Sequence, residues 1–134
     1  QEFNKLKEEG YYAETVSYNA AFGYCSYGSK KDYYIGNNDN KIIILNPYGL
    51  KQVEKLNNKK YTSFYLNVPD DVLLNRLDKR GDDKKEVHRR LKTDREDFKD
   101  IDKIVSCVIN INDKDSIKDI ANQIILNLKN KNEI

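Results

Sequence analysis

Apolar residues in the second half of the chain follow periodic patterns that predict strands and helices. Residues 62–68 are apolar on both faces, as an inner strand of a parallel sheet should be, and residues 103–112 place apolar side chains at alternate positions. Pro69 fits the first turn of a helix, and residues 117–128 repeat apolar side chains at spacings of three and four. Alternation of strands and helices predicts an α/β layer with parallel strands.

The first half of the chain predicts a smaller, β-rich lobe. Residues 2–9 form a short amphipathic helix that Gly10 ends, and residues 11–29, rich in Tyr, Val and Thr, predict two or three strands. Residues 32–45 predict a hairpin-like pair, with GNNDN as its turn and residues 42–45 as a buried strand.

A short helix is expected over residues 50–56, close to the boundary between the two parts. We therefore expect a smaller β-rich lobe in residues 1–50 and an α/β core in residues 51–134. A helical segment at about 76–98 interrupts that core.

Composition narrows the classes of function. Of the 134 residues 34% are charged, but the formal net charge is only +2 and the two signs are interleaved, which argues against a nucleic-acid partner. No run of about twenty apolar residues exists, so no membrane partner is expected. Cys25 and Cys107 lack metal-ligand spacing, and unpaired thiols with no secretory signal suggest a cytoplasmic protein.

An arginine-rich stretch carries the strongest chemical signal. Arg76, Arg80, Arg89 and Arg90 lie within fifteen residues, on two expected helices joined at Gly81. Converging guanidinium groups stabilise the negative charge that a phosphoryl group spreads over its oxygens during transfer. The alternative is a solvated, charged helical hairpin, which is the commoner meaning of a charge run.

The order of several short motifs over about a hundred residues resembles one enzyme family. The motifs are Gly10-Tyr11-Tyr12 with Glu14, Tyr27-Gly28-Ser29, the arginines Arg76, Arg80 and Arg90, and Asn112-Asp113. Together they are similar to the guanylate kinase family of nucleoside monophosphate kinases, including its bacteriophage-type members. This resemblance implies a P-loop-kinase-like parallel sheet core, a small lobe that binds the nucleoside monophosphate, and a helical lid.

The resemblance also implies a role for each matched residue. Glu14 and Ser29 would read the guanine base, and Tyr27 would hold the acceptor phosphate. The three matched arginines would clamp the phosphates, and Asn112 would lie beside the adenine of ATP. A carboxylate suits guanine, because guanine offers two adjacent N–H donors to one pair of acceptors.

The chain departs from the family pattern in three places. No G-x-x-x-x-G-K-[ST] phosphate loop occurs in it, and the segment between Glu14 and Tyr27 is longer than is usual in the family. Asn46, expected to contact the substrate, stands where the family carries a carboxylate, and an amide cannot help to hold Mg²⁺ in the same way. No protein ligands for a metal are therefore predicted.

Each matched residue also has a plainer interpretation. Glu14 would be a surface carboxylate on a strand, Tyr27 a half-buried tyrosine, and Asn112 a cap for the turn that follows it. Arg89 is assigned to the surface because its neighbour Arg90 fits the family position better. His88 is expected to be solvated.

The sequence thus predicts a guanylate-kinase-like enzyme that transfers the ATP γ-phosphate to GMP or dGMP, with Mg²⁺ accompanying ATP. The protein is expected to be a monomer or a homodimer. Because the chain begins at Gln1 and contains no methionine, we expect the gene product to carry a further N-terminal segment with the phosphate loop. The alternative is a catalytically inactive module of the same family that binds phosphorylated partners.

Overall fold

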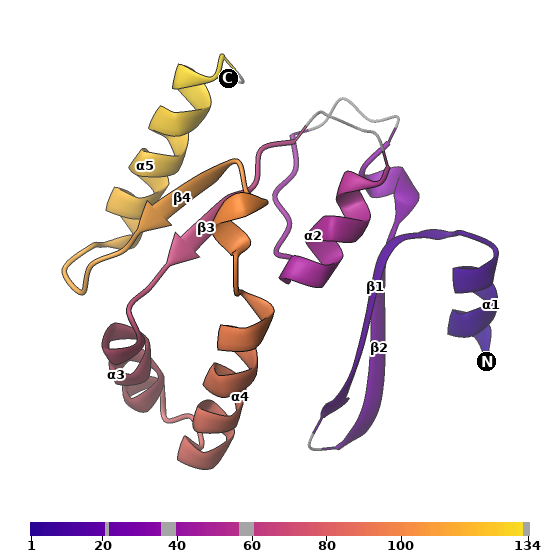
Figure 1. Ribbon diagram of the computed structural model, residues 1–134, viewed down its shortest axis with the longest axis horizontal. Coiled ribbons are helices and arrows are strands. Elements are labelled where there is room, and N and C mark those ends of the chain that lie inside the picture. The colour runs from indigo at the N-terminus through magenta and orange to yellow at the C-terminus, as the bar shows by residue number, and fades with distance from the viewer. Residues whose placement is uncertain (21, 36–39, 57–60, 133–134) are drawn as a thin grey trace. The chain divides into compact units, whose positions relative to one another are not determined.

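The computed structural model describes residues 1–20, 22–35, 40–56 and 61–132 (Figure 1). The protein is a mixed α/β chain: the part described holds five α-helices and two two-stranded sheets, one antiparallel and one parallel. The chain divides into two compact units, an N-terminal unit of residues 1–61 and a C-terminal unit of residues 62–134. No helix in these four ranges is long and apolar enough to cross a bilayer.

The N-terminal unit is organised around an antiparallel hairpin. Helix α1 (Glu2–Glu8) leads into strand β1 (Tyr12–Ala20), which pairs with β2 (Gly23–Lys30). The helix stops because Gly10 adopts a φ of 70°, a left-handed conformation that glycine reaches at little cost. Both the first helix and a strand pair in residues 11–29 were predicted from the sequence, and both are confirmed.

Helix α2 (Pro47–Glu54) packs against strand β1 (Figure 1). Its buried residues Leu50 and Val53 supply apolar surface, and the Gln52 side chain bonds to the free edge of the strand. The Thr15 N–H donates to Gln52 Oε1 at 3.0 Å, and Gln52 Nε2 donates to the Thr15 carbonyl at 2.9 Å. One amide side chain therefore takes the place of a third strand at this position.

Replacing Gln52 by Leu should destabilise the N-terminal unit by about 1–3 kcal/mol, because a buried N–H and C=O then lose their partners. Thr15 is only 7% exposed, so water replaces these bonds poorly. Chemical denaturation of the variant measures the loss. Lys51→Leu, at an exposed position of the same helix, is the control, and an equal loss in both variants would contradict the assignment.

The buried strand predicted for residues 42–45 is wrong. Residues 40–46 form neither helix nor strand, and the Ile42 and Ile44 side chains are 100% and 95% exposed. A short apolar run becomes a strand only where another strand offers it hydrogen bonds, and none does so in the part of the chain described. The predicted turn GNNDN falls almost entirely on residues 36–39, which lie outside the described ranges.

The C-terminal unit contains the parallel strand pair. Strand β3 (Phe64–Asn67) pairs with β4 (Cys107–Asn110), and helices α3 (Asp70–Arg80) and α4 (Lys84–Asp97) connect them. A short 3₁₀ turn (Ile101–Lys103) precedes β4. The core of the unit consists of buried aliphatic side chains from its helices, the 3₁₀ turn, β4 and the residue after it: Val72, Val87, Leu91, Ile101, Ile109 and Ile111.

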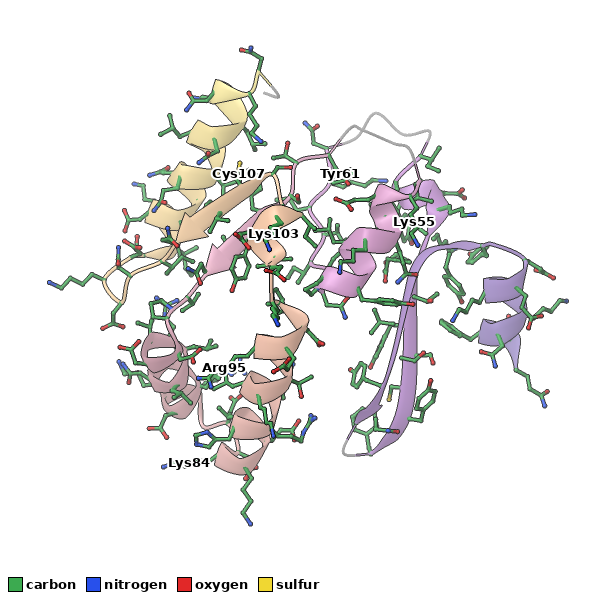
Figure 2. The ribbon with its side chains drawn as sticks, in the orientation of Figure 1. Lys55, Tyr61, Lys84, Arg95, Lys103 and Cys107 are labelled. Atoms are coloured by element: carbon green, nitrogen blue, oxygen red, sulfur yellow. The ribbon has the colours of Figure 1, made fainter. Side chains whose placement is uncertain are left out.

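Helices α3 and α4 are held by local signals at their ends. Pro69 precedes the first residue of α3, and Gly81 ends that helix with a φ of 86°. The Asp83 side chain accepts from the Glu86 N–H at 2.9 Å and so caps α4. Arg95 of α4 pairs with Asp70 of α3, which links the two helices (Figure 2). The predicted helical hairpin is thus confirmed.

Helix α5 (Ile117–Asn130) begins at a capping box, in which Ser116 and Asp119 satisfy one another's backbone N–H groups. Its 3.6-residue periodicity predicted the helix correctly. Ile117 is not part of the apolar face, however, because 87% of its surface is exposed at the first helical turn. The strand predicted over residues 103–112 is also shorter, since only Cys107–Asn110 pair with β3.

Candidate functional site

A buried carboxylate lies at the centre of the N-terminal unit. Glu14 on β1 stands directly opposite Ser29 on β2, and the Ser29 Oγ donates to Glu14 Oε1 at 2.6 Å. Glu14 is only 7% exposed, so its interpretation as a surface carboxylate is wrong. A carboxylate is costly to bury unless hydrogen bonds or positive potential compensate it, which makes this position chemically distinctive.

The first turn of helix α2 supplies part of that compensation. A Cβ added at Gly49 would lie 3.5 Å from Glu14 Oε2 and 3.2 Å from Asn46 Oδ1, so both oxygens lie close to the backbone here. The N-terminal end of a helix carries positive potential, which favours a neighbouring carboxylate. A side chain at position 49 would therefore be tight against Asn46 Oδ1, whereas its contact with Glu14 Oε2 would be an ordinary one.

Asn46 belongs to the same cluster but already has a structural task. Its Oδ1 accepts from the Gly49 N–H at 2.7 Å, which caps helix α2. The structure therefore brings together three residues that the sequence singled out for the substrate, namely Glu14, Ser29 and Asn46. We call these three residues the Glu14 cluster.

Tyr34 approaches the Glu14 cluster and was not identified from the sequence. Burial raises the pKa of its hydroxyl, a hydrogen bond with Ser29 opposes that shift, and the Glu14 charge adds to it. A tyrosine hydroxyl is protonated at neutral pH in any case, so it can donate a hydrogen bond at this position. The signal in the sequence was only the dipeptide Tyr33-Tyr34, one of two tyrosine pairs, so nothing local distinguished this residue.

Tyr27 lies on the same face of the hairpin as Glu14 and Ser29, two residues along β2. At the usual strand rise this places it about 7 Å from Ser29. Tyr27 is 54% exposed, and its ring stacks on that of Tyr18 with centroids 5.8 Å apart. The Tyr18 hydroxyl is the main cause that raises the pKa of the Tyr27 hydroxyl above its usual range.

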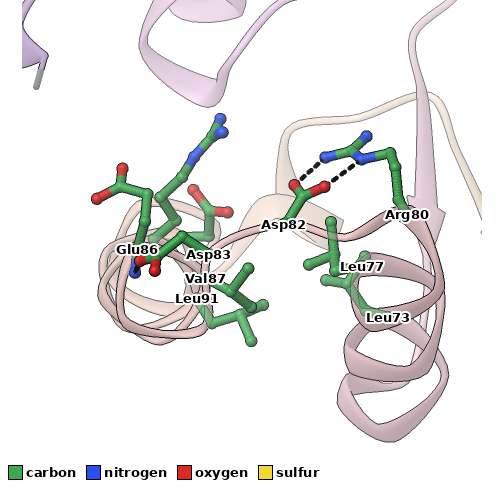
Figure 3. Close-up of a pocket in the computed structure, with 10 residues that line it drawn as sticks. Leu73, Leu77, Arg80, Asp82, Asp83, Glu86, Val87 and Leu91 are labelled. Carbon is green, nitrogen blue, oxygen red and sulfur yellow. Dashed lines mark hydrogen bonds and ion pairs between the residues drawn. The ribbon is translucent and has the colours of Figure 1, made fainter.

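The C-terminal unit carries a groove of about 260 Å³ between helices α3 and α4 (Figure 3). Leucine and valine side chains form its floor, and Arg80 and Arg90 stand on its rim with several acids. The complete lining is Leu73, Leu77, Arg80, Asp82, Asp83, Glu86, Val87, Arg90, Leu91 and Asp94. Two of the three arginines predicted to act together therefore do line one groove.

Arg80 is held away from any ligand by a neighbouring acid. Its Nε donates to Asp82 Oδ1 at 2.6 Å, and its Nη2 donates to the other oxygen of the same carboxylate (Figure 3). The turn enforces this geometry, because Gly81 is left-handed and the Asp82 N–H bonds back to the Leu77 carbonyl at 3.2 Å. Hydrogen bonding to Arg80 in turn lowers the pKa of Asp82.

Acids outnumber arginines in the groove, since four carboxyl groups accompany two guanidinium groups. Burial raises the pKa of Asp94, although the charge of Arg90 opposes that shift. A phosphate group that binds Arg80 would therefore have to displace the Asp82 carboxylate. An exposed ion pair contributes about 0–1 kcal/mol, so the exchange requires little free energy.

The remaining sequence candidates lie outside this groove. Arg76 is exposed and does not line it. Arg89 pairs with Glu86 at 2.6 Å, as its assignment to the surface implies. Asn112 is exposed after β4, and its backbone N–H donates to Asp115 Oδ2 at 2.7 Å in the turn that follows. His88 is exposed on α4.

The residues that the structure describes do not form a metal site made of protein ligands alone. Among them, no three His, Cys, Asp or Glu side chains come together in a way that could hold a metal ion. Asn46, where the family carries a carboxylate, directs its side-chain oxygen to the Gly49 N–H.

No protein-family model matches the chain, and no curated protein matches it. The Glu14 cluster and the groove between α3 and α4 are therefore the basis on which a function can be proposed.

Proposed function

We propose that the chain is the substrate-binding and lid portion of a guanylate-kinase-like nucleoside monophosphate kinase, with a P-loop-kinase-like core and GMP or dGMP as acceptor. The single observation that supports this most is the buried Glu14 carboxylate facing the Ser29 hydroxyl at 2.6 Å. The two free thiols suit a cytoplasmic location.

Guanine fits the chemistry of the Glu14 cluster better than other bases. Its ring N–H and exocyclic NH₂ point the same way and can donate to the two oxygens of one carboxylate. The Ser29 hydroxyl, which now donates to Glu14, can turn to the guanine carbonyl once the base occupies the carboxylate. Adenine and thymine lack the adjacent donor pair and would leave a buried acceptor unpaired, at a cost of about 1–3 kcal/mol.

The phosphate end of the substrate would be held by other residues. Tyr27 projects from the same face of the hairpin as the Glu14 cluster and can donate its protonated hydroxyl to the acceptor phosphate. A phosphate oxygen of GMP attacks the γ-phosphorus of ATP while the bond to ADP breaks, with no covalent enzyme intermediate. Catalysis is then positioning plus stabilisation of negative charge by Arg80 and Arg90, once Arg80 exchanges Asp82 for phosphate.

Two further residues, Arg76 and Asn112, would also contribute to nucleotide binding. Arg76 lies one helical turn before Arg80 on α3 and would contribute positive charge to the phosphates. Asn112 follows β4, at the carboxyl end of a parallel strand, where α/β sheets bind their ligands. It would lie beside the adenine of ATP.

Equilibrium binding of nucleotides to the chain tests the proposal directly. We expect GMP or dGMP to bind at least about tenfold more tightly than AMP or dTMP, measured by calorimetry at one ionic strength, because only guanine pairs with both Glu14 oxygens. Using monophosphates throughout keeps the charge constant and isolates the base. Equal affinities for the four nucleotides would contradict the assignment.

The absence of a phosphate-loop motif supports a second candidate, a binding module that uses the same lobe for phosphorylated partners. A turnover assay separates the two. Release of ADP from ATP in the presence of GMP supports the kinase. Binding of GMP or of a phosphopeptide without any turnover supports the module.

A further inference from the structure

Tyr18 lies beside the proposed phosphate contact, on the same face of the β1–β2 hairpin. The strand register pairs Tyr18 with Cys25 and Val16 with Tyr27, so Tyr18 and Tyr27 are diagonal neighbours on one face. Their rings stack with centroids 5.8 Å apart and an interplanar angle of 20°. Along the same face, the pair of Val16 and Tyr27 is followed by the pair of Glu14 and Ser29.

We propose that Tyr18 is a positioning residue for Tyr27, which it holds in the orientation that presents the hydroxyl to the substrate phosphate. This inference rests on the proposed function, because the phosphate in question is that of the nucleotide whose base meets the Glu14 cluster. Nothing in the sequence pattern singled out Tyr18, since the family resemblance matches only Tyr27.

Exposure explains why such support is needed. Tyr27 is 54% exposed, so no core packing restricts its ring, and its main ring contact is the stacked Tyr18, itself 47% exposed. A side chain that must be ordered on binding costs affinity, and preorganisation removes that cost. Stacking by Tyr18 supplies the preorganisation at an open surface.

The hydroxyl of Tyr18 adds a second effect. It raises the pKa of the Tyr27 hydroxyl, chiefly through a hydrogen bond between the two side chains, so the titration of Tyr27 reports whether Tyr18 remains in contact with it. Ring and hydroxyl can be separated by substitution, because Tyr18→Phe keeps the stacked ring and Tyr18→Leu removes both.

The experiment compares GMP with guanosine, whose only difference is the phosphate. In Tyr18→Leu the affinity for GMP should fall about fivefold while that for guanosine stays unchanged, since one well-formed aromatic contact is lost. In Tyr18→Phe the ring remains and the loss should be smaller, but the pKa of Tyr27, followed by NMR of labelled tyrosine, should move down toward its usual value.

Tyr24→Leu and Tyr24→Phe are the matched controls. Tyr24 is 70% exposed on β2 and pairs with Asn19, which places it on the opposite face of the same hairpin. We expect these variants to leave both affinities and the Tyr27 titration unchanged.

Other outcomes separate this inference from the proposed function. A loss of GMP and guanosine affinity by the same factor, or an unchanged Tyr27 titration in Tyr18→Phe, would overturn the positioning role and make the pair merely structural. The wild-type protein could instead bind GMP, AMP and dTMP equally while Tyr18→Leu lowers the affinity for GMP but not for guanosine. In that case Tyr18 keeps its positioning role and the assignment of guanine fails.

Discussion

Replacing Arg80 or Arg90 by Ala should lower kcat for GMP phosphorylation about a hundredfold each, because each substitution removes positive charge that acts mainly in the transition state. Both side chains line one groove between α3 and α4. Folding should change little, since both arginines are exposed, and the pair of Arg80 with Asp82 is of a kind that contributes about 0–1 kcal/mol at a protein surface. ADP release by the protein, with ATP, Mg²⁺ and saturating GMP, measures the effect.

Arg89→Ala is the matched control for these variants. Arg89 lies next to Arg90 on α4, but it pairs with Glu86 and does not line the groove. We expect its kcat to stay within a factor of two or so of the wild type, as is usual for surface substitutions. A wild-type kcat in the Arg80→Ala and Arg90→Ala variants would mean that the arginine-rich stretch is only a solvated, charged hairpin.

Asp82→Asn tests the exchange of partners at Arg80. The carboxylate of Asp82 occupies the two guanidinium donors that a phosphate would need. Neutralising it should therefore leave kcat intact or raise it, in contrast to Arg80→Ala. A hundredfold loss in Asp82→Asn as well would mean that the ion pair supports the fold of the turn and not the chemistry.

Replacing Glu14 by Gln should reduce the preference for GMP over AMP by about tenfold or more. The amide offers one acceptor oxygen where the carboxylate offers two, and its NH₂ opposes a guanine donor. Gln is close to Glu in size and can still accept from Ser29, so the variant should fold. Binding constants or kcat/KM for both nucleotides, with wild type and variant, measure the ratio.

Glu8→Gln provides the control for Glu14→Gln. It removes one carboxylate from the same unit at an exposed position of α1 and should leave the preference unchanged. An unaltered ratio in Glu14→Gln would remove Glu14 from the site. Its 2.6 Å bond to Ser29 would then be a structural contact that closes the hairpin.

Structural features that depend on residues a few positions apart could be predicted from the sequence alone. The helix that ends at Gly10, the helical hairpin around Gly81 and the amphipathic helix after Ser116 depend on residues a few positions apart, such as caps, left-handed glycines and the 3.6-residue repeat. Apolar runs in the second half likewise predicted the two strands β3 and β4, although both are shorter than the predicted segments. Local backbone preferences and side-chain periodicity were sufficient for these elements.

Pairings between distant residues were decided only by the tertiary structure. The register that sets Glu14 opposite Ser29 depends on where the β1–β2 turn closes, and a slip of one residue would send Glu14 to the other face. The apolar segment 42–45 resembled a strand, but no strand in the described part of the chain offers it hydrogen bonds, and Ile42, Ile43 and Ile44 are exposed in an irregular segment. Local sequence patterns therefore predicted most of the helices and strands, whereas hydrogen bonds and packing within each unit determined which side chains meet.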